Sequence, residues 1–354
     1  MSSLSRLRIT GFKSIAKLDL PLLPFNVLIG ANGAGKSNLM AFFRMLQALT
    51  QRELQLHIAR QGGADSFLHY GRKETAVLSA NLYFCSNGYS FDLEPAVDNK
   101  FIFVKELMQF QPDAPINLGG SHTESLVPAS PQGDSLMSTL ADCAVYHFHD
   151  TSDTANVKRL QAINDNVKLR HDAGNLAAFL YKLKQTSPKH YQLILKTIRQ
   201  VAPFFGDFHL RAYPENPNKI QLEWTEKGSD YPFIANDLSD GTLRFMCLAT
   251  LLLQPQMPTT ILIDEPELGL HPYAISVLAG LFRVASQRCQ LIVSTQSLNL
   301  LDEFEVEDVI VVDRENGQSV FRRLEEEKLK SWLDEYSLGE LWEKNVIGGR
   351  PTTR

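Results

Sequence analysis

Three glycines, a lysine and a serine stand close together near the start of the chain, in the stretch IGANGAGKSNLM at residues 29–40. Glycines at this spacing let successive backbone N–H groups turn inward around phosphate oxygens. A lysine directly after them can reach the β and γ phosphates of a nucleoside triphosphate, and the next hydroxyl can ligate Mg²⁺. The spacing therefore predicts a site for ATP and Mg²⁺, with Ser37 as a metal ligand. The residues expected to bind ATP are Gly30, Asn32, Gly33, Gly35, Lys36, Ser37 and Asn38.

The elements around this stretch are those that a phosphate-binding loop requires. The apolar run FNVLIG at residues 25–30 predicts a buried strand, and NLMAFFRMLQALTQRELQL at residues 38–56 predicts a helix. The helix N-terminus adds a partial positive charge that favours an anion. A chance glycine turn is the alternative, but it would not be expected between a buried strand and a helix.

Two adjacent carboxylates follow a second apolar run, TILIDEPE at residues 260–267. Four aliphatic or β-branched residues predict a buried parallel strand that ends at Asp264 and Glu265. We expect Asp264 to hold Mg²⁺ through water and Glu265 to polarise the water that attacks the γ phosphate. Two solvated acids at a strand end are the alternative, which Pro266 disfavours because it fixes the turn that follows.

Two further stretches place polar groups at the ends of elements. In NDLSDGTLRFMCLATLLLQP, residues 236–255, Ser239 or Asp240 is predicted to cap a helix, and a helix N-terminus is itself an anion site. In QLIVSTQSLNLLDEF, residues 290–304, Gln296 follows a buried strand, where ligands bind in doubly wound sheets. Gln296 is therefore a candidate to contact the γ phosphate or to orient water.

Composition limits the classes of protein that the chain can belong to. With 354 residues, 44% of them hydrophobic and 21% charged, it is long enough for a large core and a second lobe. No run of eighteen apolar residues or signal-peptide core is present, so we expect a cytoplasmic protein that does not engage membranes. The four cysteines form no CxxC pair, and a net charge of −5 argues against coating nucleic acid through bulk charge.

Taken in order, these motifs resemble the ABC-type heads of the RecF, SMC and OLD group of ATPases. The resemblance rests on ITGFKSI near the N-terminus, LSDGTLR as signature, IDEPELGLHP as Walker B and D-loop, and STQS at the switch. It is closest to small stand-alone ATPases that lack a long coiled coil, whose tail is similar to YSLGELWEKNVIGGRP. The resemblance implies an α/β fold: a P-loop NTPase head with an antiparallel β lobe and a helical insertion.

The resemblance also implies a dimer as part of the mechanism. ATP would be held between two heads, where Ser239 and Gly241 of one protomer complete the site of the other. Lys13 would touch a phosphate, or be an ordinary exposed lysine in a turn, and Gln61 is a candidate Q-loop ligand for Mg²⁺. Gln296 stands where many of these ATPases carry a histidine, so hydrolysis is expected to be slow. His271 is either a phosphate sensor or a histidine packed at a helix start.

Four segments are expected along the chain. Residues 1–65 would form the N-terminal half of the head, and residues 66–110 an antiparallel β lobe with a hairpin around Asn87–Gly88. Residues 111–235 would hold an exposed, mobile excursion up to residue 141 and then helices within 154–201, built from TANVKRLQAINDNV and NLAAFLYKLKQTSPKHYQLILKTIRQV. Residues 236–354 would complete the head.

Basic side chains gather in the expected helices of the third segment, in a chain that is otherwise acidic. They predict either a nucleic-acid groove formed across the dimer, for a partner such as duplex DNA, or a solvated helical face. They are Lys158, Arg159, Lys168, Arg170, Lys182, Lys184, Lys189, Lys196 and Arg199. Just before them, CAVYHFHD carries Cys143, His147 and His149 at near-metal spacing, which we interpret as a strand because a second pair of ligands is missing.

Two classes of function follow. The first is an ATP-driven switch in DNA repair, chromosome maintenance or defence against phage and other mobile DNA. The second is a regulatory scaffold, whose ATP-bound homodimer or higher homo-oligomer holds and releases a separate effector such as a nuclease or a toxin. After DVIVVDRENGQSVFRRL only about 30 residues remain, fewer than the ~50 that a nuclease domain needs, so any cutting is expected from another chain.

Overall fold

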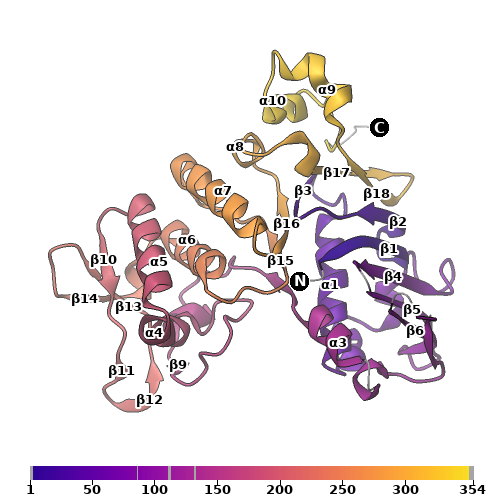
Figure 1. Cartoon of the computed structure of the whole chain (residues 1–354), viewed down its shortest axis with the longest axis horizontal. Helices are drawn as coiled ribbons and strands as arrows, with labels where there is room; N and C mark the ends of the chain where they lie inside the picture. Colours follow the sequence, from indigo (N-terminus) through magenta and orange to yellow (C-terminus); the bar gives the residue numbers. More distant parts are fainter. Residues whose placement is uncertain (1–2, 86, 111–112, 131–132, 351–354) are drawn as a thin grey trace. The chain divides into compact units, whose positions relative to one another are not determined.

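The chain forms two compact units, each assembled from separate segments (Figure 1). The computed structural model describes residues 3–85, 87–110, 113–130 and 133–350. Unit 1 comprises Met1–Val145, Pro258–Leu262 and Cys289–Arg354, and unit 2 comprises Tyr146–Met257 and Ile263–Arg288. These units cut across the four expected segments, because the stretch 236–354 contributes to both of them.

One of the two large sheets of unit 1 is antiparallel, with strand order β2-β1-β4-β5-β6-β7. Its strands are β1 (Leu4–Phe12), β2 (Ile15–Pro21), β4 (Leu78–Phe84), β5 (Asn87–Pro95), β6 (Phe101–Phe110) and β7 (Ile116–Gly119). The alternating burial along β4 is what a sheet with one covered face produces. The expected β lobe and its hairpin are confirmed, but Asn87 and Gly88 already belong to β5 instead of forming the turn, and Gly88 pairs with Tyr83.

The second sheet carries the strand that leads into the glycine stretch. Its order is β18-β17-β3-β16-β15-β8. The strands are β3 (Phe25–Ile29), β8 (Cys143–Tyr146), β15 (Thr260–Asp264), β16 (Gln290–Thr295), β17 (Val309–Glu315) and β18 (Gln318–Arg323). β3 lies between β16 and β17 and pairs in parallel with both, and every residue of β3 and β16 is buried. The continuous apolar runs of the sequence thus correspond to strands covered on both faces.

Helix α1 fills the space between the two sheets of unit 1. The run of good helix formers from Lys36 to Thr50 begins after Gly35 and buries nine side chains. Its aromatic residues join one continuous apolar core with residues of both sheets. The helices of this unit are α1 (Lys36–Thr50), α2 (Leu54–Arg60), α3 (Gly133–Ala141), α8 (Leu298–Leu301), α9 (Glu326–Leu333) and α10 (Leu338–Glu343).

The stretch that we expected to be an exposed excursion contains regular structure in its described residues. β7 extends the antiparallel sheet, and α3 buries Leu136 and Leu140 against the core. The carboxylate of Glu124 accepts hydrogen bonds from the N–H groups of Leu54 and Gln55 at 3.0 and 2.9 Å, which caps α2 from a distance in sequence. Polar composition alone did not indicate these anchoring contacts.

Unit 2 is built mainly from helices. Every residue of α6 from Leu243 to Leu253 is buried, and most of them are apolar, because the helix packs against both α5 and α7. The helices are α4 (Leu176–Thr186), α5 (Pro188–Val201), α6 (Asp240–Leu253) and α7 (Pro272–Ser286). Two small sheets, with orders β10-β13-β14 and β11-β12-β9, comprise β9 (Gln161–Ala162), β10 (Phe205–Phe208), β11 (Ala212–Tyr213), β12 (Asn216–Ile220), β13 (Glu223–Glu226) and β14 (Pro232–Ile234).

Of the helices expected within 154–201, those at the C-terminal end are confirmed as α4 and α5. The helix expected from TANVKRLQAINDNV is wrong, since that stretch holds a 3₁₀ turn at Asn156–Lys158 and the two-residue strand β9. Asn and Asp side chains compete for backbone hydrogen bonds, as Asn166 does by donating to the carbonyl of Ile163 at 2.9 Å, and this disfavours a continuous helix.

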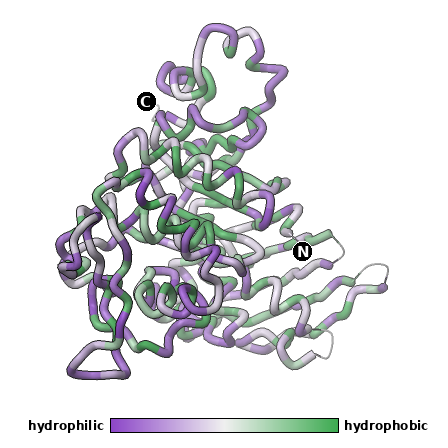
Figure 2. Tube along the Cα trace, turned by 60° about the vertical axis from the view of Figure 1, so that its left-hand side comes forward, coloured by the Kyte–Doolittle hydropathy of each residue, from purple (hydrophilic) through white to green (hydrophobic). Residues whose placement is uncertain are grey.

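Hydrophobic residues are concentrated in the interior strands and helices, and hydrophilic residues in the outer loops (Figure 2). Within the described part of the chain, no helix combines the length and the apolar character that crossing a bilayer requires.

Candidate functional site

The glycine stretch lies between β3 and α1, as its sequence context predicts, and we call Gly30–Lys36 the phosphate loop. All three of its glycines have positive φ, with values of 154° at Gly30, 78° at Gly33 and 121° at Gly35. α1 starts at Lys36, so the N–H groups of its first turn point toward the loop. Backbone N–H groups at a helix N-terminus favour an anion such as a phosphate chain.

Two of these glycines are also required by close packing. A Cβ atom at Gly30 would collide with the carbonyl oxygen of Val312, and one at Gly35 would collide with the hydroxyl of Ser319. Around Gly33, by contrast, nothing lies within 4 Å of the position that a Cβ atom would take. The phosphate loop is therefore pressed against β17 and β18 at its two ends and open at its middle.

The Lys36 side chain folds over the loop. The residue is only 5% exposed, and its Nζ donates hydrogen bonds to the carbonyls of Gly30 and Ala31, the second at 3.2 Å. A buried ammonium needs such acceptors because removing it from water is costly. Ser37 is the next residue of α1 and is exposed, with its hydroxyl available to a ligand at the helix N-terminus.

A hydroxyl network that the sequence did not indicate supports the phosphate loop. The Asn38 side chain, which we expected at the nucleotide, donates to the hydroxyl of Ser14 at 2.6 Å. That hydroxyl also shares a 2.6 Å hydrogen bond with Ser319, which in turn donates to the carbonyl of Ala34. Ser14 and Ser319 are 305 positions apart, so no local pattern could have paired them.

Lys13 lies in the turn between β1 and β2. Its φ of 46° is unusual for a residue with a side chain, and its N–H donates to the carbonyl of Phe67 at 2.8 Å. Its Nζ lies 4.8 Å from the centre of the Phe67 ring, and burial lowers the pKa of this lysine. The nearby Gln61 is exposed at the end of α2, and its carbonyl accepts a hydrogen bond from Ser66.

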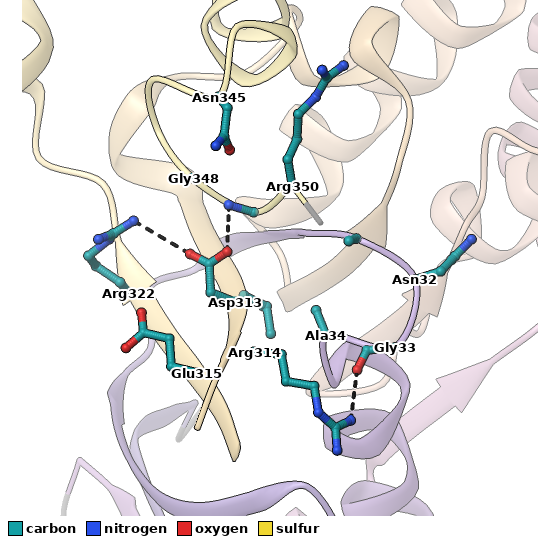
Figure 3. Close-up of a pocket in the computed structure, with 13 residues that line it drawn as sticks. Asn32, Gly33, Ala34, Asp313, Arg314, Glu315, Arg322, Asn345, Gly348 and Arg350 are labelled. Atoms are coloured by element: carbon teal, nitrogen blue, oxygen red, sulfur yellow. Dashed lines mark hydrogen bonds and ion pairs between the residues drawn. The ribbon is translucent and has the colours of Figure 1, made fainter. Parts of the chain in front are cut away.

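A pocket of about 520 Å³ borders the phosphate loop on the side of β17 (Figure 3). One wall is held to the loop by Arg314, whose Nη1 donates to the carbonyl of Gly33 at 3.3 Å. The tail forms another wall, because the N–H of Gly349 donates a hydrogen bond to the carboxylate of Asp313 at 2.7 Å. Arg322, on β18, lies 3.7 Å from the same carboxylate. The tail motif therefore ends beside the phosphate loop, which its sequence did not reveal.

Gln296 directly follows β16, the strand that pairs in parallel with β3. The hydroxyl of Thr295 accepts a hydrogen bond from the N–H of Ser297 at 2.9 Å, and Ser297 caps α8. This turn fixes the direction in which the chain leaves the strand. β15, which ends at Asp264, is the strand on the other side of β16.

The signature segment, Leu238–Gly241, lies in unit 2 at the start of α6. Ser239 is the N-cap, and its Oγ accepts from the N–H of Thr242 at 3.3 Å, so the capping prediction is confirmed. Ser239 and Asp240 are exposed, and Gly241 is half-buried. The 14-residue α6 thus presents an accessible N-terminus with a polar cap, which is chemically suited to a phosphate.

Asp264 and Glu265 also lie in unit 2 and are half-buried. Glu265 has a φ of 42°, a left-handed conformation that a side chain makes unfavourable. The carbonyl of Asp264 accepts a hydrogen bond from Nε2 of His149 at 2.8 Å. The motif CAVYHFHD thus contains strand β8, as we interpreted it. His149 follows this strand and donates a hydrogen bond to the backbone at the end of β15. His271 is exposed and caps α7 by accepting from the N–H of Tyr273 at 3.3 Å.

The family described as "AAA domain, putative AbiEii toxin, Type IV TA system" matches residues 25–82 and 140–302, which is more than half of the chain. The chain belongs to this family. The matched ranges of the AAA domain contain the phosphate loop, the signature segment, Asp264, Glu265 and Gln296. The expectation of an ABC-type P-loop ATPase of the RecF, SMC and OLD group is confirmed.

Two OLD proteins are similar to nearly the whole of this AAA-family chain. The OLD nuclease of Thermus scotoductus is 22% identical over 94% of the chain and 66% of its own length. The Old nuclease of Escherichia phage P2 is 22% identical over 92% of the chain and 62% of its own length. The chain therefore spans slightly less than two thirds of these relatives. The DNA replication and repair protein RecF of Klebsiella pneumoniae is 38% identical over 21% of the chain and 23% of RecF.

Solved structures of Smc heads share the fold of this chain. A SmcHead bound to the C-winged helix domain of ScpA gives a TM-score of 0.63 at 17% identity, covering 93% of this chain and 99% of the head. The Pyrococcus furiosus Smc head with an extended coiled coil, bound to the C-terminal domain of ScpA, gives a TM-score of 0.60 at 15% identity, with 95% and 99% covered. This likeness confirms the expected α/β head with an antiparallel β lobe.

Proposed function

We propose that this AAA-family chain binds Mg-ATP, dimerises around it and hydrolyses it slowly. The phosphate loop is the observation that carries the proposal. This loop combines three glycines with positive φ, the start of α1 and a Lys36 side chain that bonds back to the carbonyl of Gly30. The negatively charged phosphates of ATP suit such a loop, because their oxygens accept hydrogen bonds from several N–H groups at once.

Each site residue takes in this proposal the role that its motif predicts. Lys36 would exchange its carbonyl acceptors for the β and γ phosphates, the hydroxyl of Ser37 would ligate Mg²⁺, and the carboxylate of Asp264 would hold it through water. Glu265 accepts a proton from the attacking water. Gln296 orients that water without taking a proton, which is the reason to expect a low rate. Gln61 is the proposed further Mg²⁺ ligand, and Lys13 the proposed further phosphate contact.

Dimerisation is supported by the signature segment. Ser239 and Gly241 stand at an accessible helix N-terminus in unit 2, while the phosphate loop belongs to unit 1. In the ABC-type arrangement the signature of one protomer binds the γ phosphate held by the other. ATP would then stabilise the closed dimer because both sets of contacts exist together only when the γ phosphate is present.

We further propose that this cycle acts in DNA maintenance or in defence against phage and other mobile DNA. The similarity to OLD nucleases and to a DNA repair protein supports this direction. The structure reduces the basic surface expected from sequence, since Lys158 is buried and Lys184 pairs with Asp207 at 3.3 Å. Lys189 and Lys196 remain exposed on α5 and are the proposed phosphate contacts of duplex DNA.

The test is the solution mass of the Glu265→Gln variant with and without Mg-ATP, repeated with duplex DNA. The amide keeps the shape of the side chain but cannot accept the proton, so the ATP-bound dimer should accumulate while turnover falls by about 10²–10⁴. Lys36→Ala is the control and should remain monomeric under all conditions. An unchanged mass with ATP, identical to that of Lys36→Ala, would contradict ATP-driven dimerisation.

The DNA arm decides the cellular role. Co-migration of duplex DNA with the ATP-bound dimer, with a steep salt dependence that Lys189→Glu and Lys196→Glu reduce, supports the DNA switch. A dimer that forms with ATP but leaves DNA free instead favours a regulatory scaffold that holds a separate effector protein.

A further inference from the structure

Arg244 is a buried cation whose guanidinium bonds to backbone carbonyls. It lies on α6, five positions after Ser239, and is 5% exposed. Its three nitrogens donate to three backbone carbonyls: Nε to Phe148 at 2.9 Å, Nη2 to His149 at 3.2 Å, and Nη1 to Leu268. Burial lowers the pKa of this guanidinium, but an arginine stays charged at neutral pH.

These carbonyls belong to two segments, one before and one after Glu265 in the sequence. Phe148 and His149 precede it in sequence by more than 100 positions, and Leu268 follows Glu265 by three. The His149 ring completes the arrangement, since a carbonyl only accepts and Nε2 must therefore donate its proton to the carbonyl of Asp264. One residue thus receives a hydrogen bond from Arg244 on its backbone and gives one to Asp264 from its side chain.

The signature helix and the loop after Glu265 are also in direct contact. A Cβ atom at Gly241 would collide with the carbonyl of Gly269, and one at Gly269 would lie 2.9 Å from Nη1 of Arg244. Gly241 is therefore needed for the approach, and Gly269 has a φ of 76°, which favours a glycine. Glu265, four positions before Gly269 in the sequence, has a left-handed backbone, a conformation that persists only where the surroundings hold it.

We propose that Arg244 is a positioning residue that fixes the Glu265 strand end against the signature helix within unit 2. Glu265 serves the nucleotide of its own protomer, and Ser239 serves the nucleotide of the partner. Contact of Ser239 with the partner's γ phosphate would consequently be transmitted through Arg244 to Glu265. This inference rests on the proposed ATPase and dimer, and it adds a residue and a role to them.

The test compares Arg244→Met and Arg244→Lys with Arg211→Met, by steady-state ATP hydrolysis and by titration with a fluorescent ATP analogue. Arg211 is a half-exposed arginine of the same unit that pairs with Glu223. A mispositioned catalytic group costs up to about 10² in rate, so Arg244→Met should lower kcat at least tenfold and change KM less than threefold. Arg244→Lys should restore activity only in part, because one ammonium cannot bond three separate carbonyls.

His149 gives a second test that leaves Arg244 in place. His149→Gln keeps an N–H donor for the carbonyl of Asp264, whereas His149→Phe removes it. We expect His149→Phe to reproduce the loss in kcat and His149→Gln to stay within about threefold of the wild type. Equal behaviour of the two variants would contradict the proposed link, even if Arg244→Met failed to fold.

The outcomes separate this inference from the proposed function. A wild-type chain that hydrolyses no ATP overturns the ATPase proposal and this inference with it. Normal wild-type turnover, together with an Arg244→Met kcat equal to that of Arg211→Met, overturns the positioning role alone. A change confined to KM would also overturn it, because that result places Arg244 in uniform substrate binding.

Discussion

The phosphate loop shows how single residues determine what a backbone can bind. Gly30 and Gly35 combine a positive φ with contacts to β17 and β18 that leave no room for a side chain. Gly33 has the same backbone requirement but open space around it. The three glycines therefore have different tolerances, although they look equivalent in the motif.

Gly35→Ala should weaken ATP binding more than Gly33→Ala. Both changes add strain at a positive φ, but only the Gly35 variant forces the new methyl group into Ser319 and Ser14. Overpacking of this kind costs about 1–3 kcal/mol, so ATP affinity should fall about tenfold relative to Gly33→Ala. Isothermal titration with a non-hydrolysable ATP analogue measures this difference. Equal affinities would contradict the packing role of Gly35.

At the scale of elements, one buried carboxylate joins the strands of the β lobe to the segment that follows them. Glu106 on β6 is fully buried and accepts hydrogen bonds from Tyr89, Ser125 and the N–H of Leu126 at 2.6, 2.6 and 3.0 Å. Nε2 of His122 lies 3.0 Å from the same carboxylate. Burial and the neighbouring carboxylate raise the pKa of Tyr89, so its hydroxyl remains a donor.

Glu106→Ala should destabilise the chain far more than Tyr89→Phe. Removing the carboxylate leaves several buried donors without an acceptor, which we expect to lower the free energy of unfolding by about 3–5 kcal/mol. Tyr89→Phe removes one donor and leaves the others bonded, which costs about 1 kcal/mol. Urea unfolding followed by circular dichroism gives both values. A smaller loss for Glu106→Ala than for Tyr89→Phe would refute the anchoring role.

At the scale of the whole molecule, the chain passes between its two units several times. It leaves unit 1 after Val145, returns at Pro258, leaves again after Leu262 and returns at Cys289. Strand β15 is itself divided between the units, since its last two residues are assigned to unit 2. Neither unit is a continuous stretch of sequence, so we expect the two to unfold together.

Buried thiols provide a reporter in each unit. Cys143 lies in unit 1 and Cys247 in unit 2, and burial raises the pKa of both from 9.0 to about 12. The thiolate is the reactive form, so neither should react with a disulfide reagent at pH 8 until it is exposed. In a Cys85→Ser, Cys289→Ser background, both should become reactive at the same urea concentration. Two separate midpoints would show that the units unfold independently.

The same thiols predict how stability depends on pH. Their folded pKa lies above the unfolded one, so their contribution to stability is complete below pH 9 and is lost as pH rises toward about 12. Urea midpoints at pH 8 and pH 10 measure the effect, and Cys247→Ala should reduce the difference between them. An equal difference in the variant would contradict the assignment to Cys247.

The elements that the sequence located correctly are those specified by neighbouring residues. The apolar run before Gly30, the helix after it and the cap at Ser239 all depend on contacts within a few positions. The expected helix at TANVKRLQAINDNV was wrong because the Asn166 side chain bonds to nearby backbone and the backbone of Gln161–Ala162 pairs with the distant strand β12. The 111–141 stretch was misjudged because Glu106 and Leu54 anchor it from far away in sequence.

The sequence by itself determined the chemistry of the phosphate loop, because the glycine spacing, the lysine and the flanking apolar runs act locally on the backbone. It also determined the family, through motifs whose order along the chain is fixed. Only the tertiary structure decided that Ser319 closes the loop, that the tail lies beside Gly30, and that Arg244 joins the signature helix to the Glu265 strand end. These contacts link residues that are far apart in sequence or on different elements, and their formation depends on how strands and helices pack.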